Sequence, residues 1–295
     1  MAGTRQILNR LKAAENISKV TNTMETISAV RYRQYFNTWR DGRGFYDALA
    51  TMAYLMVTAE ETIDHPLMTD NDSRTTALVV IGSDRGLCGS YNSDIFRLID
   101  IHLNMAKRFN RKLKVYAAGS KVIGYLNGKD VEVADTYTDF EDIPSVEQIQ
   151  AMGDGFINDY IAGDIGRLSV VYTRFFSPAS QKAQTLSILP IAELIDDLTT
   201  RATVIWPWEK SFEDFTVTPS VEEFFDGVAK LMVNSSLSSC FLESLLSEHL
   251  SRVVAMRSAT DNANEMIESL NQEYNRARQG QITNELLDII GGTIN

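Results

Sequence analysis

Glycines are concentrated between residues 82 and 92, which read Gly-Ser-Asp-Arg-Gly-Leu-Cys-Gly-Ser-Tyr-Asn. This segment follows an apolar run at 77–81, and the carboxyl end of a buried strand is where a doubly wound sheet binds its ligands. Phosphate-binding motifs need a different spacing. Three and then two residues separate Gly82, Gly86 and Gly89, and no lysine follows them. The motif therefore argues against nucleotide binding.

The remaining reactive side chains lack the neighbours that catalysis or metal binding needs. Cys88 has no nearby histidine to act as its base, so we expect a small buried thiol. Acidic pairs at 60–61, 196–197 and 222–223 are adjacent in sequence, and their side chains diverge in regular structure. Two cysteines and three widely spaced histidines form no metal-ligand pattern. We predict no catalytic residue, cofactor or metal site, and no enzymatic activity.

The composition argues against several classes of protein. Lysine and arginine number 28 against 39 acidic residues, and the net charge of −11 disfavours nucleic acid, which binds to positive surfaces. The first residues resemble neither an export signal nor a transit segment. No apolar stretch reaches the ~20 residues of a membrane-spanning helix. We therefore expect contact with a membrane only through a partner.

The chain begins with a segment typical of a coiled-coil helix. Residues 4–60 lack proline. Apolar side chains recur there in alternating four- and three-residue steps, which predicts a helix seam at Ala13, Ile17, Val20, Met24 and Ile27. Two glycines lie in the polar patch 40–44, and each weakens a helix by about 1 kcal/mol. We expect a bend or turn at this patch.

The middle of the chain has the pattern of an α/β domain. Apolar and β-branched runs at 77–81, 113–118, 168–172 and 186–191 predict buried strands. Helical patterns follow the first two runs, and this alternation favours a mainly parallel sheet.

A second long helix is predicted after Pro219. Ser220 is a candidate N-cap, with Glu223 three residues later, and the pattern ends at Gly291. At 1.5 Å per residue this helix is on the order of 100 Å long, so we expect it to project from the α/β domain. Its seam contains many small or polar residues, which indicates that it binds a partner helix only modestly. The seam positions are Phe224, Val228, Leu231, Ser235, Ser238, Leu242, Leu245, His249, Arg252, Met256, Ala259, Ala263, Met266 and Leu270.

Pairing the two terminal helices would cover both seams. The predicted fold class is α/β, with a long antiparallel coiled coil of the N- and C-terminal helices and an inserted Rossmann-like α/β domain. The expected division is 1–62 for the first coiled-coil helix, 63–218 for the α/β domain and 219–295 for the second coiled-coil helix. An ordinary bundle helix would explain the small residues of the second seam equally well.

Several motifs resemble the gamma subunits of F-type ATP synthases. Residues 247–263 read Ser-Glu-His-Leu-Ser-Arg-Val-Val-Ala-Met-Arg-Ser-Ala-Thr-Asp-Asn-Ala and are similar to the C-terminal signature of that family. Residues 273–279 and 282–292 continue the likeness, and residues 83–92 are similar to its internal Asp-Arg-Gly-Leu-Cys-Gly motif. N-terminal positions that fit the family pattern are Asn16, Lys19, Val20, Thr21 and Met24.

The resemblance implies a non-catalytic rotor shaft. In this family an asymmetric coiled coil turns inside a ring of alpha and beta subunits, and the α/β domain rests on the c ring. Rotation moves the surrounding subunits among states of different nucleotide affinity, which couples ion flow to ATP synthesis or hydrolysis. The implied partners are the alpha, beta and epsilon subunits and the c-subunit ring. The implied location is the cytoplasmic face of a bacterial inner membrane.

The resemblance also implies partner contacts. Residues expected to face the alpha and beta subunits are Met24, Arg31, Arg33, Arg252, Arg278, Gln279, Thr283 and Glu285. Residues expected to face the c ring or the epsilon subunit are Arg40, Arg43, Tyr46, Arg85 and Tyr91. Two other functions remain open at this point. One is a Rossmann-like nucleotide-dependent enzyme, and the other is a coiled-coil scaffold that holds partners without turning.

Overall fold

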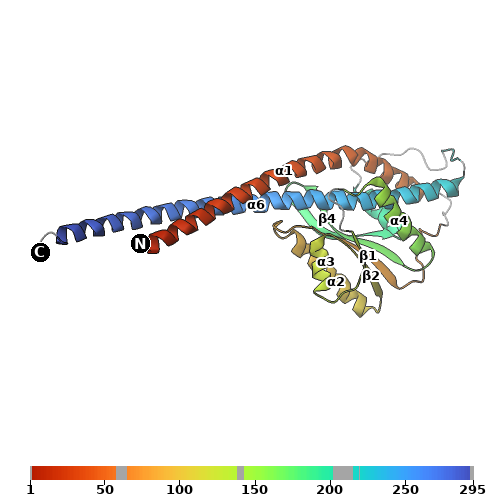
Figure 1. Cartoon of the computed structure of the whole chain (residues 1–295). Coiled ribbons are helices and arrows are strands. Elements are labelled where there is room, and N and C mark those ends of the chain that lie inside the picture. Colours follow the sequence, from red (N-terminus) through yellow and green to blue (C-terminus); the bar gives the residue numbers. More distant parts are fainter. Residues whose placement is uncertain (1, 58–64, 138–142, 202–214, 219, 293–295) are drawn as a thin grey trace. The chain divides into compact units, whose positions relative to one another are not determined.

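The computed structural model describes residues 2–57, 65–137, 143–201, 215–218 and 220–292. Figure 1 draws the chain and labels most of its elements. In chain order they are α1 (Ala2–Val57), β1 (Thr75–Ile81), α2 (Tyr91–Arg108), β2 (Lys112–Ala118), α3 (Ser120–Asn127), β3 (Val133–Tyr137), α4 (Val146–Ile161), β4 (Arg167–Ser177), β5 (Ser180–Leu189), α5 (Ile191–Arg201) and α6 (Val221–Gly292). None of the described helices is both long and apolar enough to span a bilayer.

The strands form one mainly parallel sheet, as predicted, but β3 is not among the four strands that the sequence predicted. Their order is β3-β2-β1-β4-β5, and only the β4–β5 pair is antiparallel. The apolar run at 186–191 spans two elements, because β5 ends at Leu189 and α5 begins at Ile191. The prediction of one strand there is therefore wrong at its carboxyl end.

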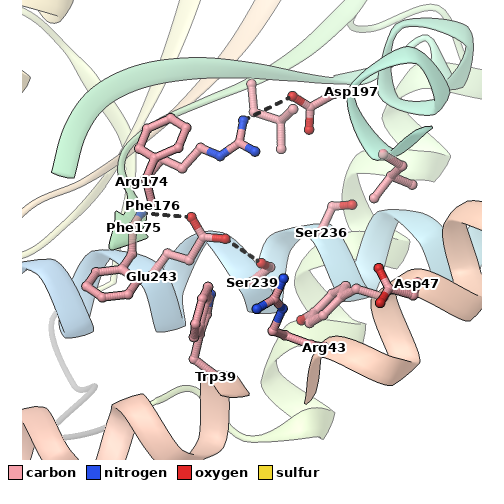
Figure 2. A pocket seen from close by; sticks show the side chains of 13 residues that line it. Trp39, Arg43, Asp47, Arg174, Phe175, Phe176, Asp197, Ser236, Ser239 and Glu243 are labelled. Carbon is pink, nitrogen blue, oxygen red and sulfur yellow. Dashed lines mark hydrogen bonds and ion pairs between the residues drawn. The ribbon is translucent and has the colours of Figure 1, made fainter. Parts of the chain in front are cut away.

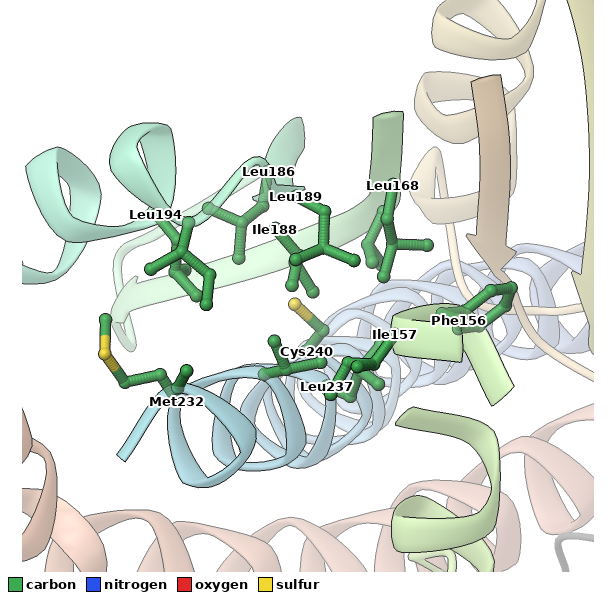
Figure 3. Close-up of a cluster of buried hydrophobic side chains, with 14 of the residues drawn as sticks. Phe156, Ile157, Leu168, Leu186, Ile188, Leu189, Leu194, Met232, Leu237 and Cys240 are labelled. Carbon is green, nitrogen blue, oxygen red and sulfur yellow. The ribbon is translucent and has the colours of Figure 1, made fainter. Parts of the chain in front are cut away.

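Both faces of the sheet are covered, and the side chains of β1 alternate between them. Leu78 and Val80 pack in a cluster with α2 and α3. On the other face, Val79 belongs to a larger cluster that includes α4, α5 and α6. Figure 3 shows part of this cluster, where Leu237 and Cys240 of α6 lie among apolar side chains of the sheet and of α4. Burial on both faces explains why β1 is an unbroken apolar run.

The chain divides into two compact units. The helix-pair unit consists of Met1–Val30 and Ser251–Asn295, and the α/β unit consists of Arg31–Leu250. Both α1 and α6 contribute residues to each unit. The expected domain boundaries at 62/63 and 218/219 fall at residues 58–64 and 219, which lie outside the described residues, so that division remains a prediction.

Within the α/β unit, α6 is a core helix. Its start is as predicted, because the backbone N–H of Glu223 donates to Ser220 Oγ at 3.1 Å. Met232, Val233 and Leu237 are fully buried in the larger cluster. The first part of the helix, up to Leu250, therefore belongs to the core of the α/β unit. Both the sheet and α1 need its apolar side chains as packing partners.

Helix α1 continues through the glycine-containing patch, so no turn interrupts it at 40–44. Aromatic contacts hold this stretch against the rest of the α/β unit. The rings of Trp39 and Phe175 meet edge to face at 5.1 Å, and Arg43 stacks over Trp39 at 5.5 Å. Tyr46 also donates its hydroxyl to the carbonyl of Ser235 at 3.3 Å. Tertiary packing thus outweighs the weak local helix propensity of two glycines.

Candidate functional site

In the helix-pair unit, α1 and α6 pack antiparallel. Ile7 and Ala14 of α1 cluster with Leu270 of α6. The hydroxyls of Thr21 and Thr260 are 2.7 Å apart and buried between the helices. Rising numbers on α1 therefore meet falling numbers on α6, which confirms the predicted antiparallel pairing.

The buried row of α1 is not the one predicted. Buried positions in this unit are Ile7, Ala14, Thr21 and Ser28, which repeat every seven residues. The predicted row lies one residue away, and most of it faces outward. The small buried side chains let α6 approach closely, although they are less apolar than the exposed row. The predicted seam at Ala13, Ile17, Val20 and Ile27 is therefore wrong.

The exposed row is the strongest candidate for a functional surface on the helix-pair unit. We call it the α1 stripe and define it as Ile17, Val20, Met24, Ile27 and Val30. Its isoleucines and valines are between 53% (Ile17) and 62% (Val30) exposed, while Met24 is half-buried. A continuous apolar row left open to solvent marks a surface that binds another macromolecule.

Helix α6 adds further exposed apolar side chains to the same unit. They are Val254, Met266, Ile282 and Leu286. Leu231 of the α/β unit and Met266 are both exposed, so neither occupies the predicted seam. An ion pair between Arg257 Nε and Glu25 Oε1, at 2.9 Å, joins the two helices at the edge of the seam.

Only some of the residues expected to contact the alpha and beta subunits have exposed side chains. Exposed members are Arg33, Arg278, Gln279 and Thr283, while Met24 and Arg31 are half-buried. Arg252 is only 8% exposed, so little of its side chain is available to a partner. The side chain of Glu285 lies outside the described residues.

The second expected set of contacts lies in the α/β unit. Arg40, Arg43 and Arg85 are exposed, and Tyr46 is half-buried. Tyr91 is only 4% exposed, so little of its ring is available to a partner. Burial raises the pKa of the Tyr91 hydroxyl well above its usual value, which keeps the group neutral.

Hydrogen bonds between its own residues stabilise the loop at 82–92. The Asn92 side-chain amide donates to Ser83 Oγ at 2.7 Å and accepts from the Ser83 N–H at 3.2 Å. Leu87 has a positive φ of 65° and is exposed beside Arg85, while the Cys88 thiol is buried as predicted. Sequence reasoning missed Leu87. The glycines around it indicated a turn, but nothing indicated which side chain the turn displays.

The place where a Rossmann-like sheet binds nucleotide is filled by α6. The carboxyl ends of β1 and β2 face Phe241, Leu245 and Glu248, which leave a cavity of only about 40 Å³. A Cβ on Gly82 would lie 2.3 Å from the Val122 side chain. The glycine there serves close packing of strand and helix, not the approach of a phosphate. This geometry argues against the nucleotide-dependent enzyme.

A larger cavity of about 240 Å³ lies elsewhere in the α/β unit (Figure 2). Its charged side chains are engaged within the unit. Arg174 pairs with Asp197 at 3.9 Å, and Glu243 accepts from Ser239 Oγ at 3.2 Å. In the part of the chain that the structure describes, no three potential metal ligands come together. Of the acidic pairs, 196–197 and 222–223 do not converge, and 60–61 lies outside the described residues.

Comparison with known proteins gives consistent likenesses. A family model described as ATP synthase matches residues 3–294. The ATP synthase gamma chain of Rhodopirellula baltica is 32% identical over 293 residues, which cover 99% of this chain and 98% of that protein. The ATP synthase gamma chain of Glaesserella parasuis is 28% identical over 292 residues, which cover 99% of each.

Solved structures give the same fold. A chain of the Euglena gracilis mitochondrial ATP synthase, from the OSCP/F1/c-ring structure in rotational state 3, matches with a TM-score of 0.68 and 18% identity. That match covers 99% of this chain and 94% of the other. A chain of the Tetrahymena thermophila mitochondrial ATP synthase central stalk and c-ring matches with a TM-score of 0.55 and 22% identity, covering 81% and 99%.

Proposed function

The chain belongs to the ATP synthase gamma chain family, and from this premise we propose that it is the central rotor shaft of a rotary F-type ATP synthase. Such a shaft couples ion-driven rotation of the c ring to ATP synthesis or hydrolysis on the surrounding subunits. One observation carries the proposal above the others. The family likeness runs from residue 3 to residue 294 and includes both terminal helices, which a rotor needs and a soluble nucleotide enzyme does not.

The α1 stripe gives the helix pair a surface that surrounding subunits can bind. We call the ring of alpha and beta subunits that would enclose the pair its sleeve. Burying each half-exposed isoleucine or valine would contribute on the order of 1 kcal/mol. The seam that holds α1 to α6 is rich in small and polar residues, so a surrounding sleeve would steady a pair with a modest grip of its own. As the asymmetric pair turns, different stripe residues would meet each catalytic subunit and bias it toward a different state.

Contacts to this sleeve are proposed for the expected residues that the structure shows to be accessible, which are Met24, Arg31, Arg33, Arg278, Gln279 and Thr283. Glu285, whose side chain lies outside the described residues, stays among the proposed contacts. Arg252 of this set and Tyr91 of the second set are left out because they are buried. Contacts to the c ring and the epsilon subunit are proposed for Arg40, Arg43, Tyr46 and Arg85, together with the exposed Leu87.

We further propose that the subunit has no catalytic role of its own. The complex would lie at the cytoplasmic face of a bacterial inner membrane, with the c ring as this chain's link to the bilayer. The filled strand edge, with its cavity of about 40 Å³, supports the absence of a nucleotide site.

Affinity purification of the chain from native membranes tests the proposal. We expect alpha, beta and epsilon subunits to copurify with it in an ATP-hydrolysing complex. Recovery without ATPase subunits would refute the rotor. Calorimetry of the isolated chain with ATP and NAD tests the enzyme alternative, for which binding heats are required. A single-molecule rotation assay separates the rotor from a stationary scaffold, since only the rotor turns during hydrolysis.

A further inference from the structure

Strand β4 extends beyond its parallel neighbour. It pairs with β1 only from Arg167 to Val171, whereas its pairing with β5 continues to Ser177. Past Val171, no strand among the described residues pairs with the β1 side of β4. Buried main-chain groups need partners.

Helix α6 supplies those partners with side chains. The N–H of Thr173 donates to Ser244 Oγ at 3.4 Å, and Ser247 Oγ donates to the carbonyl of Thr173 at 3.3 Å. Two residues further along β4, the N–H of Phe175 donates to Glu243 Oε2 at 3.1 Å, as Figure 2 shows. The side chains of α6 thus replace a missing neighbouring strand.

These contacts are shielded from water. Glu243 is 6% exposed, and Ser244 and Ser247 are still more deeply buried. A second bond fixes the carboxylate, because Ser239 Oγ donates to Glu243 Oε1. A buried hydrogen bond is short-ranged and directional, so it resists sliding of the helix along the strand better than apolar contacts do.

We propose that Glu243, Ser244 and Ser247 form a clamp that fixes the α/β domain rotationally to α6, so that torque passes between domain and shaft without slippage. The inference rests on the proposed rotor function and adds positioning residues to it. The clamp residues touch neither nucleotide nor ion. They act through the stiffness of the joint between β4 and the helix that continues into the helix-pair unit.

Amide hydrogen exchange in the assembled complex tests the contacts themselves. The variant Ser244→Ala/Ser247→Ala should speed exchange at the Thr173 amide about fivefold, the equivalent of one lost net hydrogen bond of about 1 kcal/mol. Ser236→Ala is the matched control. It removes a buried serine hydroxyl from the same helix, and that hydroxyl has no hydrogen-bond partner among the described residues. Unchanged exchange at Thr173 in the double variant would overturn the clamp.

The ratio of ion pumping to ATP hydrolysis tests the role of the clamp in passing on torque. In complexes reconstituted into vesicles, we expect Ser244→Ala/Ser247→Ala and Glu243→Leu to lose ATP-driven ion pumping per ATP hydrolysed. Glu243→Gln keeps an acceptor oxygen for Phe175 and should retain more pumping than Glu243→Leu. Pumping that stays proportional to hydrolysis in every variant would overturn the torque role. Unchanged exchange at the amides of β1 would show that the variants fold.

Different results would refute the rotor function and the clamp. If the unaltered chain does not copurify with ATPase subunits, the rotor function fails whatever the clamp does. If that complex forms and pumps normally with a loosened clamp, only the clamp fails.

Discussion

At the scale of single residues, the hydroxyl pair of Thr21 and Thr260 defines the register of the helix pair. Each hydroxyl also lies within hydrogen-bond distance of its own helix backbone, at the carbonyls of Ile17 and Met256. One of the two must donate to the other across the seam. Polar pairs of this kind in a coiled-coil seam fix register at some cost in stability.

Replacing one member should cost more than replacing both. We expect Thr21→Val to lower the unfolding free energy of the chain by about 1 kcal/mol, because it leaves the hydroxyl of Thr260 without its partner across the seam. Thr21→Val/Thr260→Val should recover most of that loss. Urea unfolding measures both values. Thr26→Val is the control, since Thr26 is exposed and bonds only to the Asn22 carbonyl. Additive losses in the double variant would contradict the pairing.

Asp100 gives a pH dependence with a defined sign. A hydrogen bond from Lys129 is the main reason that its pKa lies below the usual 3.8, and Tyr125 donates to the same carboxylate. Because the folded pKa is depressed, this stabilisation is present above pH 3.8 and is lost as pH falls through the folded value. Solvent screening keeps it modest.

The prediction for Asp100→Asn follows from that sign. The variant should be less stable than the unaltered chain near neutral pH, and the difference should shrink at acid pH. Thermal unfolding between about pH 3 and pH 7 measures it. A difference that stays constant over this range would show that the carboxylate charge is not responsible.

At the scale of elements, α1 contains a glycine that the fold does not require. Nothing lies within 4 Å of a Cβ placed on Gly44, and its backbone is helical. Gly119 is the opposite case. Its φ is +96°, and an added Cβ would lie 2.4 Å from the Gly82 carbonyl oxygen.

The two glycines should therefore respond in opposite directions to the same substitution. We expect Gly44→Ala to raise the unfolding free energy by about 0.5–1 kcal/mol, because alanine loses less backbone entropy in a helix. Gly119→Ala should lower it by several times that amount. Denaturant titration of the two variants side by side checks the signs, and a destabilising Gly44→Ala would mean that the glycine has another role.

The sequence predicted the elements better than their contacts. Strand β1 was predictable because burial on both faces leaves an unbroken apolar run. The seam of α1 was not, because two rows one residue apart share the same spacing and the exposed row is the more apolar. The uninterrupted helix at 40–44 was not predictable either, because the residues that Trp39 and Tyr46 contact lie far away in the sequence. No sequence pattern indicates that Glu243, Ser244 and Ser247 of α6 form hydrogen bonds with a strand.

At the scale of the whole molecule, a substitution in the α1 stripe should affect the assembled complex much more than the folding of the chain. Val20 is exposed, so Val20→Lys should change the unfolding free energy of the isolated chain by less than about 0.5 kcal/mol. In the complex, the same charge would face the sleeve and have to be desolvated. We expect weaker coupling of rotation to ATP synthesis, measured in membrane vesicles. Asn22→Lys is the control, because Asn22 is exposed and is not three or four residues from any stripe residue, and equal effects of the two would contradict the assignment.

The same stripe bears on how the cell must make this chain. Between release from the ribosome and capture by its partners, the protein carries a row of bare isoleucines and valines that chaperones, proteases and other copies of itself would all recognise. Surplus chains are therefore a liability. In the proposed rotor, the synthesis of this chain has to be matched in amount and timing to the synthesis of the subunits that would surround it.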